Sequence, residues 1–548
     1  TILKVIISSI IFNFSFFVSN AQWYNPDMVN KKAGEIYGQA YEEATQGNYT
    51  AALKHLSEAL ALDPKFVDVY LSRAGIYADL KNYSASVSDF ETGMKMDSVY
   101  SKTYLLPCSI SLAGVGKFEQ ALAIVKEFFA TPNLNPQSIK AGNYRKSTYI
   151  FAVDYAKKHP VKDYVFAPVN LGDSINTKDL EYFPSLTIDG SKMIFTRRVA
   201  SDEDFYESDF MDGKWGNAKP LGGKVNTNLN EGAQNISQDG QLLVFTGCNY
   251  PEGQGSCDLY FSIKTKTGWS EPQNLGPIVN TDFWESSPSL SPDKRDLYFA
   301  SSMAGGYGGR DIWVTHRLSN GKWGRPENLG ETVNTIGDES CPFIHADNET
   351  LYFNSNGHPG YGMTDLFFSK KINDSTWATA ENLGYPINNI DDQGSLIVAA
   401  DGKTAYYASD GTDSKGGLDL YSFQLREDVR PLKTWWVKGK VFDKKTLRGL
   451  PSSVELTAIK TDKTISKIQT DEDGNYLVTL PVGKDYAFNV NRKGYLFYSD
   501  NFSLTNNSDS AFIVNIPLQP IEKGASIVLK NIFFETGKFE LQAVSKPE

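Results

Sequence analysis

The sequence predicts a multidomain protein in which an α-helical solenoid is followed by a five-bladed β-propeller and a small β-sandwich, with the first elements of an α/β domain at the end. Three observations support this fold class. A 34-residue period runs through residues 31–160, a period of 50 to 54 residues runs through residues 164–425, and apolar residues alternate with polar ones after residue 434. The two periods are typical of stacked helix pairs and of radial blades, and the alternation is typical of half-buried strands.

The length and charge of the chain exclude some classes of protein. A chain of 548 residues is too long for a single hydrophobic core, so several domains are expected. The formal net charge is −11, and Lys and Arg form no cluster. Because binding to a nucleic acid backbone needs clustered cations, we expect no nucleic acid partner.

Four cysteines in this length cannot hold the whole fold together through disulfides. Cys248 and Cys257 flank the loop of one predicted hairpin, and they could pair in an oxidising compartment. The alternative is that both are small, unpaired residues. Cys108 and Cys341 fall in different predicted domains.

Residues 1–21 have the pattern of a secretory signal peptide. Lys4 precedes an apolar run over residues 5–18, and Ser19 and Ala21 are small residues at the two positions that an export peptidase reads. The run is too short to span a bilayer comfortably, and no later segment is apolar enough to do so. We therefore expect an exported, soluble mature protein without an N-terminal lipid anchor, because no cysteine follows Ala21 directly.

Residues 22–162 are predicted to form helical repeats. A turn of one type occurs three times, at Gly47-Asn48-Tyr49, Lys81-Asn82-Tyr83 and Gly116-Lys117-Phe118. Small residues recur 34 positions apart, as at Ala40 and Ala74, and let paired helices approach closely. This pattern resembles tetratricopeptide repeats (TPRs), with three repeats and a terminal helix near residues 139–157. Ser86 and Ser109 stand where alanine is usual, so the second and third copies are degenerate.

The TPR resemblance implies a concave face that binds a protein partner. The alternative is that the three repeats only pack against the propeller. His55 and His159 stand apart from cysteines and carboxylates at ligand spacing, so we expect neither to bind a metal.

Residues 163–428 contain one pattern written five times. Each copy opens with Asn-Leu-Gly, or with Pro-Leu-Gly in the second copy, and the leucines are Leu171, Leu221, Leu275, Leu329 and Leu383. These leucines are 50, 54, 54 and 54 residues apart. Two apolar runs follow, and the second opens with an aspartate, at Asp204, Asp258, Asp311, Asp365 and Asp419. Short β-runs repeated with this period predict blades arranged radially.

The copies also predict how the ring closes. Each copy supplies three strands and a fourth near the next refrain, but the last copy stops at Leu425 before its fourth strand. A spare strand lies at the opposite end, over residues 165–171. Joining this strand to the last blade would complete a five-bladed ring and remove exposed sheet edges.

One column of the repeat holds carboxylates, at Glu181, Glu231, Glu285 and Glu339, with Gln393 in the fifth copy. They precede an inner strand, so they could ring the mouth of a channel and hold a cation or a polar ligand. The alternative, which we favour, is that a residue present in every blade has a task that every blade shares, such as capping a turn. The repeated aspartates follow Gly-rich loops, and we expect the same structural role for them.

Residues that occur in one blade only are better candidates for contacts with a partner, because the fold does not require them. They are Trp284, Tyr307, His358 and Tyr361. We expect no cofactor and no metal. The glycine-rich segment at Tyr307 joins two strands rather than a strand and a helix, so it is no phosphate-binding loop.

The five copies resemble the PD40 or WD40-like propeller family, to which the TolB propeller is related. The most specific match is an Asp-Gly pair followed by a phenylalanine, at Asp189-Gly190 with Phe195 and at Asp239-Gly240 with Phe245. Some peptidases carry such a propeller beside a hydrolase domain. This chain has no Gly-x-Ser-x-Gly motif, no His-Glu-x-x-His motif and no alternation of strands and helices that would house a catalytic triad, so we expect no enzyme activity.

Residues 434–520 are predicted to form a β-sandwich. Apolar residues alternate at Val437 and Val441 and again around Val478 and Val490, with turn residues between the runs. The segment resembles the carboxypeptidase regulatory-like domain, which implies a non-catalytic module. The acidic turn at Asp471 lacks the downstream glutamate of a calcium loop, so a hairpin turn explains it better.

Residues 526–548 resemble the entry of an OmpA-like peptidoglycan-binding domain. The resemblance rests on the stretch that runs from Asn531 to Leu541, where a strand leads to a helix. Only the start of such a domain is expected here, and the residues that would bind the cell wall are expected beyond Glu548. The sequence therefore names no wall-binding residue.

The order of these parts resembles PorE-like proteins of the OmpA family, which belong to the type IX secretion machinery. The resemblance implies a non-catalytic periplasmic adaptor at the outer membrane. Its TPR and propeller surfaces would hold an envelope protein of the secretion or gliding machinery, such as an outer-membrane β-barrel of the PorP/SprF family. The portion beyond Glu548 would hold peptidoglycan.

Two other functions stay open. The propeller could bind a small ligand, a peptide or a glycan in its central channel, which would need an open, polar channel with aromatic walls. The chain could also be a degenerate hydrolase, which would need a nucleophile beside a base in a cleft.

Overall fold

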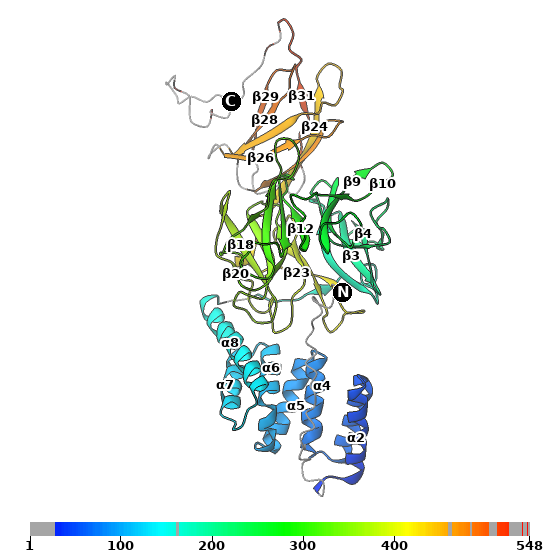
Figure 1. Ribbon diagram of the computed structural model, residues 1–548, viewed down its shortest axis with the longest axis vertical. Coiled ribbons are helices and arrows are strands. Elements are labelled where there is room, and N and C mark those ends of the chain that lie inside the picture. The colour runs from blue at the N-terminus through cyan, green and yellow to red at the C-terminus, as the bar shows by residue number, and fades with distance from the viewer. Residues whose placement is uncertain are drawn as a thin grey trace. The chain divides into compact units, whose positions relative to one another are not determined.

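The computed structural model describes residues 28–160, 164–458, 463–482, 485–503 and 512–524, together with residues 526, 540 and 545 (Figure 1). It divides the chain into two compact units, Thr1–Lys158 and His159–Glu548. The predicted signal peptide lies outside the described residues, and so does nearly all of the OmpA-like stretch. Among the described residues, no helix is both long enough and apolar enough to cross a membrane.

The first unit is made of helices that follow one another side by side. Three antiparallel pairs are α2 (Lys31–Thr45) with α3 (Tyr49–Leu62), α4 (Val67–Asp79) with α5 (Tyr83–Met96), and α6 (Leu105–Gly114) with α7 (Phe118–Phe129). The short 3-10 helix η2 (Tyr100–Tyr104) precedes α6, and α8 (Pro136–Lys158) closes the series against α7. The predicted helical region is confirmed.

The repeated turns of this unit form because their residues accept a left-handed backbone. Gly47 and Gly116 have φ of 78° and 77°, and Lys81 takes the same place in the middle repeat with φ of 56°. The degenerate small positions also have an explanation. Ser86 is fully buried, but its hydroxyl donates to the Ala74 carbonyl (2.7 Å) and bonds to Ser111 Oγ (2.8 Å), so no polar group is left unsatisfied.

The second unit begins with four antiparallel sheets whose strands follow chain order. The first has β2 (Leu180–Leu186), β3 (Lys192–Val199), β4 (Asp202–Met211), β5 (Lys214–Trp215) and β6 (Lys219–Pro220), and the second has β7 (Asn230–Ile236), β8 (Leu242–Cys248), β9 (Cys257–Thr265), β10 (Gly268–Trp269) and β11 (Gln273–Asn274). The third has β12 (Glu285–Leu290), β13 (Asp296–Ser301), β14 (Asp311–His316) and β15 (Glu327–Asn328). The fourth has β16 (Glu339–Ile344), β17 (Thr350–Ser355), β18 (Asp365–Asn373), β19 (Thr376–Trp377) and β20 (Glu381–Asn382).

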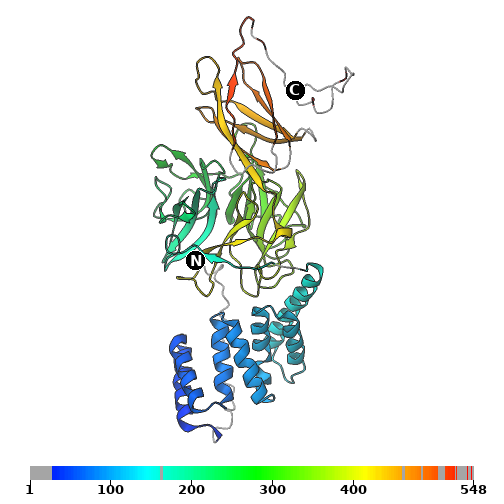
Figure 2. The same cartoon turned by 180° about the vertical axis from the view of Figure 1, so that it is seen from behind.

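The fifth sheet takes strands from both ends of this region. It contains β21 (Leu396–Val398), β22 (Thr404–Ser409) and β23 (Asp419–Gln424), and β1 (Val169–Asn170) pairs with β23 in the register Val169 to Ser422 (Figure 2). The first strands are neighbours in the order β2, β7, β12, β16 and β21, and β21 and β22 lie next to β2 again. Each interface between neighbouring sheets has its own apolar cluster, as around Phe245, Phe299 and Phe353.

The first strand of each of the first four sheets carries a β-bulge at one repeated position. The bulged residues are Phe183, Ala233, Ser287 and Cys341, with φ between 48° and 54°. A non-glycine residue in this conformation is uncommon, and bulges re-aim the side chains of a strand. The sequence pattern gives no sign of this bulge, because the four residue types differ.

After η3 (Glu427–Val429), two four-stranded sheets enclose another core. One sheet holds β24 (Thr434–Asp443), β27 (Asn475–Pro481), β30 (Phe512–Ile513) and β31 (Ile516–Leu518). The other holds β25 (Ser453–Ala458), β26 (Lys463–Gln469), β28 (Asp485–Asn491) and β29 (Tyr498–Ser503). Val437 and Val478 from the first sheet pack with Leu456, Phe488 and Val490 from the second, as the alternation of apolar residues predicts.

Candidate functional site

The asparagines of the repeats tie neighbouring strands together. In the first, third, fourth and fifth refrains, the Asn side-chain oxygen accepts the N–H of the glycine two residues later and the side-chain NH₂ of an asparagine six residues later, all at 2.7–2.9 Å. In all five copies that second asparagine bonds both backbone groups of the residue that follows the repeated aspartate. These side chains replace backbone partners in the turns and are therefore structural.

The repeated aspartates cap the Gly-rich loops. Asp311 accepts the N–H groups of Tyr307 (2.6 Å) and Gly308 (3.2 Å) and the Asn328 side-chain NH₂ (2.7 Å). Asp258, Asp365 and Asp419 are also buried and accept loop N–H groups in the same way. The structural role expected for these aspartates fits this geometry in four copies.

The four repeated glutamates do not face an open channel. Glu181, Glu231, Glu285 and Glu339 are each 0% exposed. Each accepts the backbone N–H and the hydroxyl of the threonine four residues earlier, as Glu285 does from Thr281 at 2.9 and 2.6 Å. Burial raises the pKa of all four carboxyl groups despite these donors. The geometry corresponds to the turn-capping alternative.

The ends of the first strands line a small cavity. Its volume is about 30 Å³, and Leu186, Asn235, Phe343 and Ile397, from four different sheets, contribute to its lining. A buried water needs roughly 10–15 Å³ of such space, whereas drug-sized ligands occupy pockets of roughly 300–1,000 Å³. This cavity therefore has room for water but not for a sugar or a peptide.

Two of the four predicted contact residues are held inside the fourth sheet. Tyr361 is 2% exposed, and its ring lies 6.4 Å from that of Tyr385, so its prediction as a contact residue is wrong. His358 is half-buried, bonds the Val333 carbonyl through Nε2 (2.8 Å) and packs on Phe367. Both residues fill space in their own blade, and Tyr361 has a counterpart in the third blade, where Tyr307 stands at the same position before the repeated aspartate.

The other two lie on an exposed surface. Trp284 is half-buried under the Arg310 guanidinium (5.2 Å), and Tyr307 is 50% exposed. Phe283 (47% exposed) directly precedes Trp284 in the chain, and Ile336 (89% exposed) lies near Tyr307 because the Tyr307 loop packs against the backbone of Ile336 through Gly308. We call Phe283, Trp284, Tyr307 and Ile336 the loop surface.

Sequence reasoning missed Phe283 and Ile336, because large apolar residues also occur at the equivalent turn positions of other copies. Leu229 stands in the column of Phe283, and Ile390, which is 7% exposed, stands in the column of Ile336. A large apolar side chain in a turn exposed to water is unfavourable unless another molecule covers it, so such residues mark contact surfaces.

A buried His–Asp pair was also missed. His345 Nε2 bonds the Ala399 carbonyl (3.1 Å), and its Nδ1 accepts the Asp347 N–H (3.1 Å). Asp347 in turn accepts the backbone N–H of Leu432 (3.0 Å), in the segment that leads to β24. Burial raises the pKa of Asp347, but His345 and the surrounding donors lower it more, so this pKa lies below its ordinary value. The pair joins turns of the fourth and fifth sheets.

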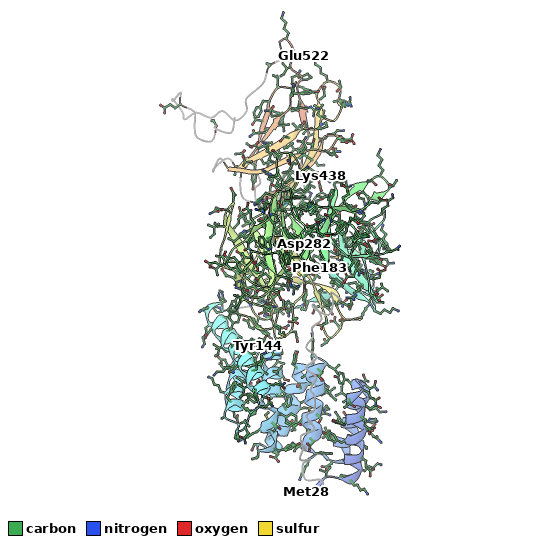
Figure 3. The ribbon with its side chains drawn as sticks, in the orientation of Figure 1. Met28, Tyr144, Phe183, Asp282, Lys438 and Glu522 are labelled. Carbon is green, nitrogen blue, oxygen red and sulfur yellow. A yellow bond between two sulfur atoms is a disulfide. The ribbon has the colours of Figure 1, made fainter. Side chains whose placement is uncertain are left out.

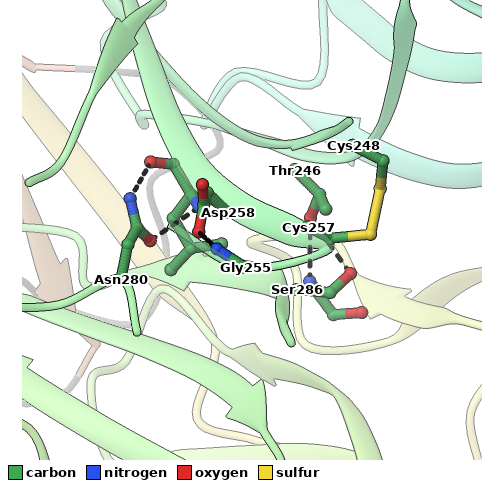
Figure 4. Close-up of a disulfide and its surroundings, with 9 residues drawn as sticks. Thr246, Cys248, Gly255, Cys257, Asp258, Asn280 and Ser286 are labelled. Carbon is green, nitrogen blue, oxygen red and sulfur yellow. Dashed lines mark hydrogen bonds between the residues drawn. A yellow bond between two sulfur atoms is a disulfide. The ribbon is translucent and has the colours of Figure 1, made fainter. Parts of the chain in front are cut away.

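Cys248 and Cys257 form a disulfide across the β8–β9 hairpin (Figure 4). The same hairpin carries Gly255, whose N–H is donated to Asp258. The disulfide closes the loop that holds Tyr250, and Tyr250 Oη donates to Glu231. Cys108 is buried and Cys341 is half-buried, and both are free.

The helical unit presents several exposed apolar side chains. They include Tyr41 on α2 and Ile139, Tyr144 and Ile150 on α8, with exposures of 37–42%. Tyr144 is labelled in Figure 3. Its interior contains one buried ion pair, in which Arg73 donates two hydrogen bonds to Asp89 at 2.7 and 2.9 Å. The pair joins α4 and α5, and this bidentate geometry fixes how the two helices meet.

No metal-binding cluster occurs in the described part of the chain, where no three His, Cys, Asp or Glu side chains come together at ligand spacing. His55 and His159 belong to no such group. His316 lies beside Asp296 (2.8 Å), which raises the pKa of the imidazole. These contacts are pairwise and structural.

The helical geometry agrees with a sequence comparison. Residues 40–81 match the TPR repeat family. This stretch is a TPR repeat. A FAM10 family protein of Arabidopsis thaliana is 31% identical over 67 residues, which cover 12% of this chain and 15% of that protein, so the chain spans only a small part of this relative.

Solved structures with similar parts fall into two groups. The first TPR of Spaghetti (RPAP3), bound to an HSP90 peptide, covers 23% of this chain and 97% of its own, at 16% identity and a TM-score of 0.21. TolB from Acinetobacter baumannii covers 51% and 69%, at 13% identity and 0.32. An α-L-arabinofuranosidase from Lactobacillus brevis covers 47% and 94%, at 14% identity and 0.34. Similarity at this level says nothing about the activity or partners of this chain.

Proposed function

We propose that this protein is a non-catalytic periplasmic scaffold that holds envelope proteins through its TPR unit and a five-bladed β-propeller. The observation that carries this proposal is the TPR repeat at residues 40–81, within three helix pairs. Stacked repeats of this kind have an extended concave face, and a protein partner is their general ligand.

The first five sheets of the second unit support a propeller as the second holding surface. Their first strands succeed one another around a circle, and β1 completes the sheet of β23. We interpret this arrangement as a closed ring of five blades, which has no unpaired sheet edge to cause aggregation. A closed ring suits a scaffold because its loops are presented on a rigid support.

Within the propeller, the loop surface is the proposed contact site. Four large side chains from two neighbouring blades lie there. The residues repeated in every blade, by contrast, already use their polar groups in hydrogen bonds within the turns. Contact residues on interfaces are enriched in aromatic side chains and in Arg, and Trp284, Tyr307 and Arg310 fit that composition.

The alternative of a ligand in the central channel receives less support from the geometry. The glutamates that would ring the channel are fully buried and hydrogen bonded, and the cavity at the strand ends has a volume of about 30 Å³. A partner held at the surface needs neither an open channel nor polar channel walls.

The cellular role extends this proposal. The resemblance to PorE-like proteins suggests that the partner is an outer-membrane component of a type IX secretion or gliding machinery, and that an OmpA-like domain links the scaffold to peptidoglycan. Binding at two places at once would raise the effective concentration of the second contact, which is how a scaffold couples two envelope layers.

The experiment is a pull-down from envelope extracts with three tagged proteins. One is wild type, one carries Tyr307→Asp and Ile336→Asp on the loop surface, and one carries Ile372→Asp, which changes a 68% exposed apolar residue on β18 outside this surface. We expect the double variant to lose a captured membrane protein by at least tenfold and the Ile372→Asp variant to keep it. Equal capture by all three proteins would contradict the loop surface. Equal capture after deletion of residues 31–160 as well would contradict the scaffold.

A further inference from the structure

Four of the five sheets cover the turn of the next sheet with a glycine-rich loop. The glycine three residues before each repeated aspartate lies directly on backbone carbonyls of that turn, at Gly255, Gly308, Gly362 and Gly416. A Cβ on Gly308 would lie 2.4 Å from both the Thr335 and the Gly337 carbonyl oxygens, and one on Gly416 would lie 2.2 Å from that of Lys178. Only glycine fits at this approach, and Gly309 N–H bonds the Gly337 carbonyl (2.8 Å).

The first sheet lacks this loop. Only two residues, Ala200 and Ser201, connect β3 to β4, whereas eight or nine residues connect the equivalent strands of the other four sheets. The shortening accounts for the 50-residue spacing of the first two refrains. The turn of the second sheet, residues 227–230, is therefore not covered by a glycine-rich loop. We call these residues the junction turn.

The aspartate of the shortened copy has lost its donors as well. Asp204 is half-buried, whereas Asp258, Asp311, Asp365 and Asp419 are at most 2% exposed. Within the described residues, no group donates a hydrogen bond to the Asp204 carboxylate. The loop that would supply N–H groups is absent, and Pro220 stands where other refrains have the asparagine. Burial and the neighbouring Asp202 raise the pKa of Asp204.

A groove opens on the other side of the junction turn. Its volume is about 570 Å³, and Lys224, Thr227, Asn228, Tyr250, Glu252 and Glu271 contribute to its lining. The Asn226 side chain at its edge bonds both backbone groups of Phe205, the residue after Asp204. Asn226 is half-buried, whereas its counterparts in the other four copies are at most 2% exposed. Glu203 N–H donates to the Asn230 side chain (3.2 Å) at one end of the junction turn, whereas Thr227 and Asn228 face the groove.

We propose that the junction turn is a docking site for a glycine-containing turn of a protein partner, which takes the place of the missing loop. The four complete junctions show what fits there. The surface offers backbone carbonyls and an unpaired carboxylate, which are hydrogen-bond acceptors. A partner must therefore present N–H donors close to its own backbone. Two successive N–H groups of a tight turn bind a carboxylate well. An anionic ligand is disfavoured because the Asp204 carboxylate lies at the site and Glu252 lines the adjoining groove.

This inference rests on the proposed function and deepens it, because it names a second surface by which the scaffold would hold a partner. It differs from the loop surface in chemistry. The loop surface offers apolar side chains, whereas the junction turn offers hydrogen-bond acceptors, and the four complete junctions admit no side chain at the closest approach.

The test uses the chain's own loop as a probe. A cyclised, fluorescently labelled peptide with the sequence of residues 303–310 is titrated into the full chain, and binding is followed by fluorescence anisotropy. The control peptide carries the change Gly308→Val. We expect the first peptide to bind in the micromolar to millimolar range that is typical of a single turn, and the control to bind at least tenfold more weakly.

Two variants place this binding at the junction turn. Asp204→Asn keeps the size of the side chain but removes the carboxylate, and we expect at least a tenfold loss of affinity. In a second variant, Ala200-Ser201 is replaced by the loop of residues 302–310, and we expect no peptide binding because the site is filled from within. The midpoint of chemical unfolding reports whether each variant folds.

Absence of binding to the wild-type chain at millimolar peptide would overturn the inference, and so would equal binding of both peptides or undiminished binding to Asp204→Asn. The two proposals fail separately. If the wild-type chain binds no peptide but still captures the envelope partner, only the junction turn proposal is contradicted. If the chain binds the peptide but captures no envelope partner, only the loop surface proposal is contradicted.

Discussion

Asn170 and Asp419 are hydrogen bonded at 2.8 Å although 249 residues separate them in the chain. The same bond, from the refrain asparagine to the repeated aspartate, links Asn328 to Asp311 within one sheet over 17 residues. The hydrogen bond that joins neighbouring strands within one sheet therefore also joins the two ends of the repeat region. The bond between Asn176 and the backbone of Leu420, 244 residues apart, reinforces this closure.

The closure predicts different effects for two chemically identical changes. Asn170→Ala and Asn328→Ala each remove a hydrogen bond to a charged group, so we expect each to lower the free energy of unfolding by about 1.5–3 kcal/mol. Only Asn170→Ala should increase hydrogen exchange in β1 and β23, because only there does the bond join distant segments. Exchange that rises equally in both variants, or in neither, would contradict the closing role of Asn170.

The glycine-rich loops predict a position-specific cost. Gly308→Ala would place a methyl group 2.4 Å from two carbonyl oxygens, so backbone must shift, and we expect a loss of about 1–3 kcal/mol in the free energy of unfolding. Gly222→Ala is the control, because nothing lies within 4 Å of a Cβ built there. Chemical denaturation of both variants measures the two losses of free energy of unfolding. An equal loss at the two positions would show that the glycine-rich loop can shift to make room for the methyl group.

Asp365 predicts a pH dependence of stability. Burial raises the pKa of its carboxyl to about 6 from an ordinary value of 3.8. Because folding favours the protonated form, the stability that Asp365 contributes is fully present below pH 3.8 and is lost as the pH rises through about 6. Relative to Asp365→Asn, the wild type should lose about 1.4 kcal/mol per pH unit at most, roughly 3 kcal/mol in all.

Asp239 is the control of opposite sign for that experiment. Burial raises its pKa, but Lys294, 2.5 Å away, and the surrounding hydrogen bonds lower it more, so the pKa lies below 3.8. Its stability contribution is present above pH 3.8 and is lost as the pH falls through the lowered value. Urea unfolding of both Asn variants from pH 3 to 8 measures the two slopes, and parallel slopes would contradict the assignment.

The disulfide predicts sensitivity to reductant. The bond between Cys248 and Cys257 closes a loop with a sequence separation of 9, so its loss should lower the free energy of unfolding by about 2–3 kcal/mol by the loop-entropy model. Thermal unfolding of the wild type with and without dithiothreitol measures the change. A variant with both Cys248 and Cys257 replaced by Ser should not respond, whereas replacement of Cys108 and Cys341 should leave the response intact.

The helical unit predicts a stabilising substitution. Gly75 lies inside α4, and nothing lies within 4 Å of a Cβ built on it. Gly75→Ala should raise the stability of this unit by about 0.5–1 kcal/mol, because glycine loses more backbone freedom on folding than alanine does. Hydrogen exchange should slow in α4 and α5 and stay unchanged in the sheets. Slower exchange in the sheets as well would show that the two units unfold together.

Most repeated positions could be assigned a structural role before the structure was known, because a residue present in every copy serves a task that every copy shares. The glutamates illustrate this, since each caps the turn formed by its own threonine four residues earlier. Such contacts are local in sequence and therefore visible as a pattern. The departure from the pattern at Asp204 was also visible in the sequence, because the first two refrains are 50 residues apart rather than 54 and Pro220 replaces the refrain asparagine.

The predicted contact residues were harder to place because their exposure depends on neighbours that are distant in sequence. Tyr361 and Tyr307 stand four residues before equivalent aspartates, yet the first is buried and the second is half exposed. The difference arises from what packs against each loop, such as the ring of Tyr385 beside Tyr361. No local rule of sequence reports that neighbour.

The sequence by itself determined the repeats, their turns, the helical character of the first unit and the residues that cap each loop, because these depend on contacts within a few residues or within one period. Only the tertiary structure decided that Ile336 and Phe283 are exposed, that His345 is enclosed between two sheets, and that the junction turn is left uncovered. Those outcomes depend on side chains brought together across sheet boundaries, where packing and the presence or absence of a neighbouring loop decide between burial and exposure.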